Sequence, residues 1–292
     1  MINNYKLWTA LITPLNEDGS VNYDELTLLL KQQEEARNGI LILGSTGEAL
    51  NLSLDEKKKI IEHTLKLELE VPIMCGVGGI NIDTTNDWVD HLNSKNIDCY
   101  LLVTPLYAKP GEEGQTHWFK TLLDKATKPC MLYNIPGRTG ISLNVNTVKT
   151  LATHKNFWSI KEASGSVDDF KNYVEAANGK PVYSGDDPML PAYVPVGAKG
   201  LVSVASNVWP KQTNLYTQLA LKNELQSPHP WKESSEALFC ASNPVPAKVL
   251  LKELGIISSA KTKAPLSEKD LKNNNLILEA NKNINDWFNS RK

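Results

Sequence analysis

The stretch GILILGSTGEALNLSLDEKKKIIEHTL, residues 39–65, combines a short apolar run with an amphipathic segment. Its first six residues are apolar without alternation, which is typical of a parallel strand buried on both faces. Ser53 and Glu56 have the spacing of a helix capping box, and Ile60 and Ile61 start the apolar face of the segment that follows. This stretch predicts a β-strand, a loop and an α-helix.

Seven further runs are short, rich in Val, Ile and Leu, and bounded by Gly, Pro or Ser. They are WTALIT (8–13), VPIMCGVG (71–78), CYLLVTP (99–105), CMLYNIP (130–136), WSIKEAS (158–164), PVYSGDD (181–187) and GLVSVAS (200–206). Helical signals lie between them, since Asn22 precedes an amphipathic run that stops near Gly39, and Ser166 with Asp169 repeats the capping spacing loosely. A strand followed by a helix, eight times, predicts a (β/α)8 TIM barrel.

The main alternative architecture is an open, doubly wound sheet. That fold would require a Gly-rich phosphate-binding turn after the first strand, and LITPLNEDG (11–19) is not one. From about Trp209 the alternation ends, and the rest is expected to form helices broken at SPHP, NPVP and TKAP. We therefore expect a barrel carrying the active site at residues 1–208 and a helical C-terminal region at 209–292.

Composition points to a small-molecule partner. The chain has 292 residues, 41% of them hydrophobic, and a net charge of −2, which gives no electrostatic footprint for nucleic acid or an acidic membrane. With no basic leader and no membrane-length apolar run, we expect a cytoplasmic protein. The five histidines share no ligand spacing, so no metal is predicted. Three of the four cysteines fall in strand-like runs and are expected to pack in the core; the cysteines are Cys75, Cys99, Cys130 and Cys240.

Lys161 is the first candidate for chemistry, because it lies inside the apolar run WSIKEAS near a predicted strand end. Burial there would lower the pKa of its amine. A neutral amine can attack a ketone, and the protonated imine then acts as an electron sink for making or breaking a carbon–carbon bond. Pairing with Glu162, or an ammonium that extends to solvent, remains open as an alternative.

Other polar candidates follow neighbouring strands. The segment 44–47, Gly-Ser-Thr-Gly, offers backbone N–H groups and the hydroxyls of Ser45 and Thr46 to a small carboxylate, although an ordinary turn has the same appearance. Tyr133 is a candidate acid or base, or simply a buried tyrosine with a hydrogen bond. Arg138 has a planar guanidinium suited to a carboxylate, or is solvated like most loop arginines.

Several ordered motifs, spread over nearly the whole chain, resemble the dihydrodipicolinate synthases. This family belongs to the pyruvate-dependent aldolases, which also contain N-acetylneuraminate lyase. The motifs are GSTGEALNLSLDEK from Gly44, VTPLYAKP around Tyr107, YNIPGRTG from Tyr133, SIKEASG around Lys161, SGDD ending at Asp187, GLVSVASNV from Gly200, and NPVPAK ending at Lys248.

The resemblance implies a set of catalytic roles. Lys161 would form an imine with pyruvate, without a separate cofactor. Ser45 and Thr46 would hold the pyruvate carboxylate, and Tyr133 would shuttle protons in a relay with Ser45 and Tyr107. In this family Tyr107 reaches the site from a neighbouring subunit, which implies a homotetramer built as a dimer of dimers.

The resemblance also implies the reaction, a condensation of pyruvate with L-aspartate 4-semialdehyde in lysine and diaminopimelate biosynthesis. Arg138 would bind the carboxylate of the aldehyde, and Val202 would flank pyruvate. An aldolase of a sugar-derived 2-keto acid such as N-acetylneuraminate is the nearest alternative, but a polyol chain needs hydroxyl partners rather than a cation. A noncatalytic scaffold would be expected to have lost these residues.

Two departures from the family pattern matter. Ser45 stands where threonine is usual, so the hydroxyl is kept and the restraining methyl is lost. Family members inhibited by lysine typically have histidines, a glutamate and a tyrosine at four positions where this chain has apolar, cationic or small side chains; these are Leu54, Lys57, Thr85 and Leu106, with Asn81 retained. We therefore expect weak or absent inhibition by lysine.

Overall fold

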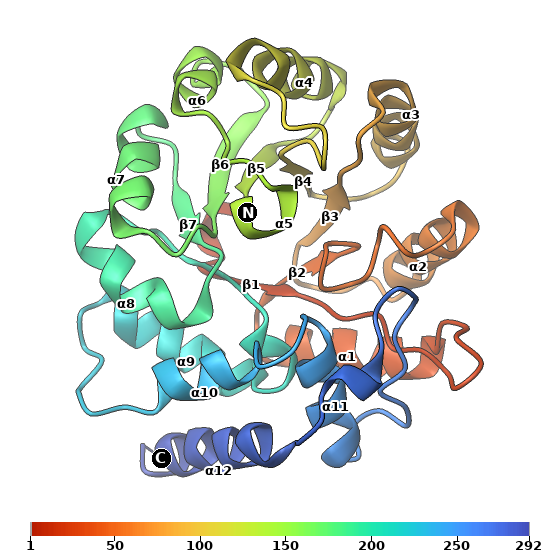
Figure 1. The fold of residues 1–292 in the computed structure, drawn as a ribbon, viewed down its shortest axis with the longest axis vertical. Helices are drawn as coiled ribbons and strands as arrows, with labels where there is room; N and C mark the ends of the chain where they lie inside the picture. The colour runs from red at the N-terminus through yellow and green to blue at the C-terminus, as the bar shows by residue number, and fades with distance from the viewer. Residues whose placement is uncertain (1, 292) are drawn as a thin grey trace.

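The computed structural model describes residues 2–291, and its eight strands close into a barrel (Figure 1). Every strand pairs in parallel with the next one along the chain, and β8 pairs with β1. The strands are β1 (Leu7–Ala10), β2 (Gly39–Ile42), β3 (Ile73–Val77), β4 (Cys99–Val103), β5 (Cys130–Asn134), β6 (Phe157–Glu162), β7 (Val182–Ser184) and β8 (Leu201–Ser203). The predicted TIM barrel is confirmed.

Helices surround the barrel and continue beyond its last strand (Figure 1). They are α1 (Tyr23–Glu35), α2 (Leu54–Lys66), α3 (Ile82–Asn93), α4 (Glu112–Lys125), α5 (Pro136–Thr139), α6 (Val145–Leu151), α7 (Val167–Ala176), α8 (Leu190–Tyr193), α9 (Pro210–Leu221), α10 (Trp231–Ala237), α11 (Val245–Glu253) and α12 (Asn275–Asn289). Within residues 2–291, no helix combines the length and the apolar character needed to cross a membrane.

The predicted helix starts are confirmed, and α1 ends close to its predicted end. Ser53 and Glu56 form a reciprocal capping box at α2, and Ser166 caps α7. Helix α1 ends at Glu35 with Ala36 as its C-cap, so Gly39 is not part of the helix terminus. Gly39 instead opens β2, where a Cβ atom would lie 2.6 Å from the Trp8 ring, so close packing inside the barrel explains this glycine.

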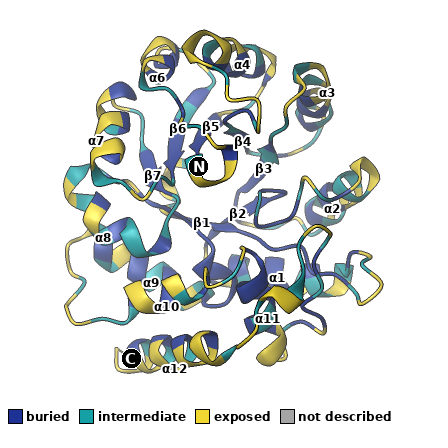
Figure 2. Cartoon of the chain, in the orientation of Figure 1, coloured by how far each residue is buried: buried dark blue, intermediate teal, exposed yellow. Residues whose placement is uncertain are grey.

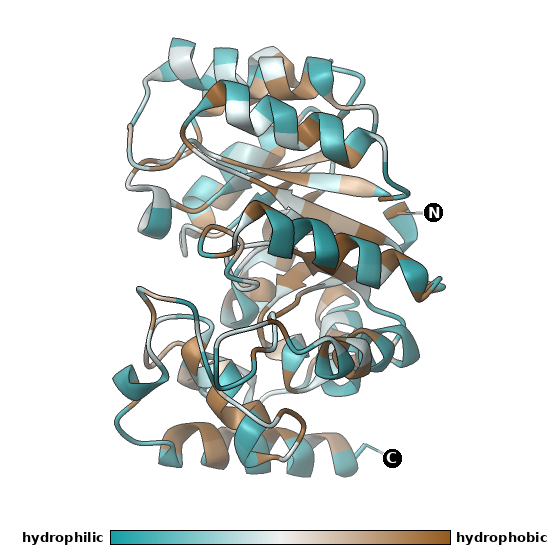
Figure 3. Cartoon of the chain, turned by 90° about the vertical axis from the view of Figure 1, so that its right-hand side faces the viewer, coloured by the Kyte–Doolittle hydropathy of each residue, from teal (hydrophilic) through white to brown (hydrophobic). Residues whose placement is uncertain are grey.

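The apolar side chains form two layers. One fills the barrel interior and includes Trp8, Leu41, Met74, Leu101, Met131, Tyr133, Tyr183 and Val202. The larger layer lies between strands and helices, so the strands are almost entirely buried while the helices expose their outer faces (Figure 2). The helices are correspondingly apolar on one side and hydrophilic on the other (Figure 3). A filled interior closes the barrel to solvent, and reactive groups are therefore accessible only at a strand end.

The chain beyond residue 208 packs back against the barrel. Helix α9 contacts β1, and α12 lies along α10 (Figure 1). The division into a barrel at 1–208 and a helical region at 209–292 remains a prediction. Helix α9 belongs to the second part of this division, although it packs against the barrel as the earlier helices do. The three cysteines predicted for the core, Cys75, Cys99 and Cys130, are buried and free.

Candidate active site

Tyr133 and Lys161 are neighbours at the carboxyl ends of β5 and β6. They are paired in register, and each is the second-last residue of its strand. Lys161 is 4% exposed, and its Nζ atom lies 4.1 Å from the centre of the Tyr133 ring. The predicted position of Lys161 within a buried strand is thus confirmed, and the amine faces an aromatic ring instead of solvent.

Burial lowers the pKa of the Lys161 amine to about 8. The carboxylates of Asp186 and Asp187 oppose this shift, whereas the guanidinium of Arg138 adds to it. Desolvation dominates because a buried ammonium loses its hydration. Near neutral pH a usable fraction of the amine is therefore unprotonated and able to attack a carbonyl carbon.

The alternative that pairs Lys161 with Glu162 does not fit the geometry. The side chain of Glu162 is buried, and its two oxygens accept from Asn134 Nδ2 at 2.6 Å and from the backbone N of Ser164 at 2.8 Å. Burial raises the pKa of Glu162 to about 7. No ion pair joins it to Lys161 in the described part of the chain.

Two aspartates near Lys161 had no role assigned from the sequence, although their motif SGDD was noted. Burial raises the pKa of Asp186 to about 6, and its Oδ2 has no hydrogen-bond partner among residues 2–291. Asp187 accepts from the hydroxyl of Ser203 and from Val204 N at 2.9 Å, which fixes the end of β8. Both carboxylates favour the charged form of the Lys161 nitrogen, as they would favour an iminium.

Tyr133 has an environment that keeps its phenol protonated. Burial raises the pKa of the phenol, and the charge of Asp186 raises it further. The guanidinium of Arg138 and a hydrogen bond with the Ser45 side chain lower it. Tyr133 can therefore donate a proton, and it needs neighbouring groups to take one back.

A cavity of about 1210 Å³ opens beside this pair. Four of the predicted site residues line it: Ser45, Tyr107, Tyr133 and Arg138. Tyr107 is 88% exposed and has a left-handed backbone with φ of 63°.

Three other predicted residues are not among those lining the cavity. Lys161 is buried with its Nζ over the Tyr133 ring, and Val202 is fully buried in the barrel interior. Thr46 is buried, and its Oγ1 accepts from Asn243 Nδ2 at 2.9 Å. The carbonyl of Asn243 in turn accepts from Arg138 Nη2 at 3.1 Å. Asn243 is the first residue of the NPVPAK motif, and no local pattern in the sequence connects it with the site.

The fold and the site define a class, a (β/α)8 enzyme with a buried lysine amine beside a tyrosine at the carboxyl ends of its strands. Comparison with known proteins defines the family. Residues 3–283 match the model of the dihydrodipicolinate synthetase family. The chain therefore belongs to this family, and it is a lyase of the same class as these synthases.

Individual relatives cover almost the whole chain. A protein of Francisella tularensis subsp. novicida named 4-hydroxy-tetrahydrodipicolinate synthase is 44% identical over 289 residues, 98% of each chain. The dihydrodipicolinate synthase of Acinetobacter baumannii, solved in complex with pyruvate, superposes with a TM-score of 0.90 at 31% identity, covering 96% of this chain and 99% of that one. The enzyme of Cyanidioschyzon merolae, solved with lysine bound, has a TM-score of 0.90 at 27% identity, covering 97% and 99%.

Proposed function

We propose that the chain condenses pyruvate with L-aspartate 4-semialdehyde through an imine on Lys161, as a 4-hydroxy-tetrahydrodipicolinate synthase in lysine and diaminopimelate biosynthesis. The observation that carries this proposal is the buried Lys161 amine, whose pKa is about 8, packed against Tyr133. The names of the relatives and the pyruvate complex of the Acinetobacter enzyme support the choice of substrates.

The proposed chemistry uses groups that lie at this site. The neutral amine of Lys161 attacks the ketone carbon of pyruvate, and water leaves to form the iminium. Loss of a methyl proton gives an enamine, whose carbon adds to the aldehyde. The amino group of the second substrate then attacks the imine carbon and releases the Lys161 amine. Tyr133 moves protons in these steps, relayed by Ser45 and Tyr107, and no cofactor is required.

The proposal also assigns binding roles to polar groups near the site. Ser45 and Thr46, with the N–H groups of their loop, would hold the pyruvate carboxylate, and Val202 would flank the pyruvate as part of the apolar barrel wall. Arg138, at the cavity, would bind the carboxylate of the aldehyde. A cation at this place favours a short acidic aldehyde over a polyol chain, and so favours the synthase over a sugar-acid aldolase.

The assembly and the location are part of the same proposal. The exposed Tyr107 would complete the relay of a neighbouring subunit, in a homotetramer that is a dimer of dimers. Free cysteines at the described positions fit a reducing cytoplasm.

We further propose that lysine inhibits weakly or not at all. In the cavity, Lys57 Nζ lies 4.9 Å from the centre of the Trp88 ring, and burial lowers the pKa of this lysine. Leu54 and Leu106 line the same cavity with apolar side chains. A ligand ammonium would meet another cation and no carboxylate from these residues.

The test measures condensation with a coupled dihydrodipicolinate reductase assay in the wild type, Lys161→Ala and Arg138→Ala. The proposal expects activity in the wild type and its loss in both variants, together with a borohydride-stable pyruvate adduct on Lys161. An adduct without condensation would favour an aldolase of a sugar-derived acid. Absence of the adduct would overturn the imine.

A further inference from the structure

A buried ion pair joins the loop at residues 44–48, here called the carboxylate loop, to the C-terminal segment at 243–263. The side chains of Lys248 and Glu48 are 0% and 1% exposed, and Lys248 Nζ donates to Glu48 Oε1. Lys248 Nζ also donates to the carbonyl of Lys261 at 2.8 Å. The second oxygen of Glu48 accepts from Lys263 N at 2.7 Å. Both oxygens of this carboxylate are therefore bound by the C-terminal segment.

A second connection lies two residues earlier in the same loop. Asn243 Nδ2 donates to Thr46 Oγ1, and the Asn243 carbonyl accepts from Arg138 Nη2. One residue of the C-terminal segment thus contacts Thr46, which the proposed function assigns with Ser45 to the pyruvate carboxylate, and Arg138, which it assigns to the carboxylate of the aldehyde. The segment acts on the site at two points that flank Gly47.

The backbone of the carboxylate loop needs such support. Glu48 has a left-handed φ of 57°, and Leu43, just before the loop, has one of 55°. Residues with a Cβ atom rarely adopt this conformation unless their surroundings enforce it. On the barrel side, Gly76 lies so close to the Leu43 carbonyl that a Cβ atom would be 2.0 Å from its oxygen, and Thr13 Oγ1 donates to the Gly47 carbonyl at 2.8 Å.

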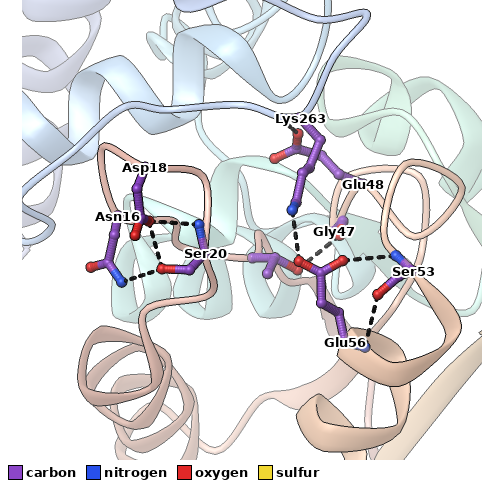
Figure 4. Close-up of polar contacts among 9 residues, drawn as sticks. Asn16, Asp18, Ser20, Gly47, Glu48, Ser53, Glu56 and Lys263 are labelled. Carbon is purple, nitrogen blue, oxygen red and sulfur yellow. Dashed lines mark hydrogen bonds and ion pairs between the residues drawn. The ribbon is translucent and has the colours of Figure 1, made fainter.

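The opposite side of the loop is held by the C-terminal segment. Figure 4 shows Lys263 lying over the loop between Glu48 and Glu56, and Lys263 Nζ contacts Glu56 Oε1 at 2.6 Å. That contact is partly exposed and joins a helix start, whereas the Glu48–Lys248 pair is dry and adjoins Gly47. A desolvated ion pair contributes little net stability compared with apolar side chains of the same size. The stability of the fold therefore does not explain this pair, and the geometry that it imposes on the loop is the better explanation.

We propose that Glu48 and Lys248 are positioning residues for the carboxylate of pyruvate. Their ion pair fixes the carboxylate loop in the left-handed turn that presents the hydroxyls and N–H groups of Ser45 and Thr46. The barrel supplies the nucleophile, and the C-terminal segment supplies the restraint that shapes the pyruvate pocket. This inference rests on the proposed role of Ser45 and Thr46.

The test compares Lys248→Met and the double variant Glu48→Gln/Lys248→Met with the wild type. The double variant removes both charges while nearly keeping side-chain volume, so it is expected to fold. The measured quantity is the pyruvate concentration that half-saturates borohydride labelling of Lys161. We expect it to rise at least about tenfold in both variants, because small misplacements of binding groups have effects of this size. Complete labelling at saturating pyruvate and the KM of the aldehyde should change much less.

Lys263→Met is the matched control. It breaks the partly exposed contact with Glu56 on the same segment and leaves the Lys263 backbone bond to Glu48 in place. Its half-saturating pyruvate concentration should equal that of the wild type. If the double variant does not fold, Asn243→Ala tests the second connection, with a rise in the same direction expected.

The experiment distinguishes failure of the proposed function from failure of the positioning role. A wild type that pyruvate does not label would overturn the proposed function and this inference with it. A labelled wild type alongside a folded double variant with an unchanged half-saturating concentration would overturn the positioning role alone.

Discussion

The Nζ atom of Lys161 lies over the ring of Tyr133, 4.1 Å from its centre, and the two residues are paired across β5 and β6. The face of an aromatic ring attracts a cation, whereas burial disfavours one. With the pKa at about 8, the amine keeps about a tenth of its population neutral at pH 7. An unperturbed lysine would have far less of the nucleophilic form.

The pH dependence of imine formation follows from this value. In the proposed reaction the neutral amine is the nucleophile, so labelling by subsaturating pyruvate should speed up as the pH rises through about 8 and level off above it. Pulses of cyanoborohydride at a series of pH values, with the adduct measured by mass, test this. Lys161→Ala is the blank, and a rate that keeps rising toward the ordinary lysine pKa would contradict the expectation.

Removing the phenol of Tyr133 should slow the reaction without unfolding the barrel. For Tyr133→Phe we expect kcat for condensation to fall by about a hundredfold or more, as is typical when a general acid is lost. Tyr183→Phe is the control, because Tyr183 is also buried in the barrel interior but donates to the Tyr5 carbonyl. Equal losses in the two variants would indicate a packing effect.

Space around the lysine stem gives a steric prediction. A Cβ atom at Gly185 would lie 2.8 Å from Lys161 Cε and 2.7 Å from Ala163 Cβ, so Gly185→Ala must displace the amine. We expect labelling by pyruvate to slow at least about tenfold. Gly111→Ala, where nothing lies within 4 Å, should behave like the wild type. Normal labelling of Gly185→Ala would show that the position of the amine matters less than proposed.

Subunit mixing tests whether Tyr107 acts in a neighbouring site. Lys161→Ala and Tyr107→Phe are each expected to be impaired in condensation. After denaturation and refolding together, mixed dimers contain one site with the native lysine and a native tyrosine from the partner. Recovery of activity above the sum of the separate variants is expected, and no recovery would place Tyr107 in its own subunit's site.

Lysine inhibition can be tested in the wild type and in a variant designed to be more sensitive to lysine. The wild type should keep most of its activity in millimolar lysine, because Lys57 occupies the cavity. A variant carrying Leu54→His, Lys57→His, Thr85→Glu and Leu106→Tyr should become more sensitive. Half-inhibition of the wild type by submillimolar lysine would contradict the first expectation.

The sequence predicted the barrel because its signals are local. Buried parallel strands read as unbroken apolar runs, and the capping box at Ser53 and Glu56 depends on three-residue spacing alone. The reason for Gly39 could not be predicted, because this glycine resembles a helix terminator, while its actual constraint is the ring of Trp8, thirty-one residues away in the chain.

The candidate site was predictable where strand order decides it. Lys161 and Tyr133 had to lie near each other once their strands were neighbours. The part played by Asn243 could not be foreseen, because its contacts with Thr46 and Arg138 cross 197 and 105 residues of sequence. No periodicity or local spacing encodes such pairings.

The distance in sequence between Glu48 and Lys248 has a consequence for biosynthesis. The two partners are 200 residues apart. At translation rates of about 5–20 residues per second, Lys248 is therefore synthesised roughly ten to forty seconds after Glu48. The strand that bears Lys161 ends at Glu162, 86 residues before Lys248, so it is complete while the turn proposed to hold the pyruvate carboxylate still lacks its final restraint. The nascent chain should thus acquire its full affinity for substrate only near the completion of its synthesis.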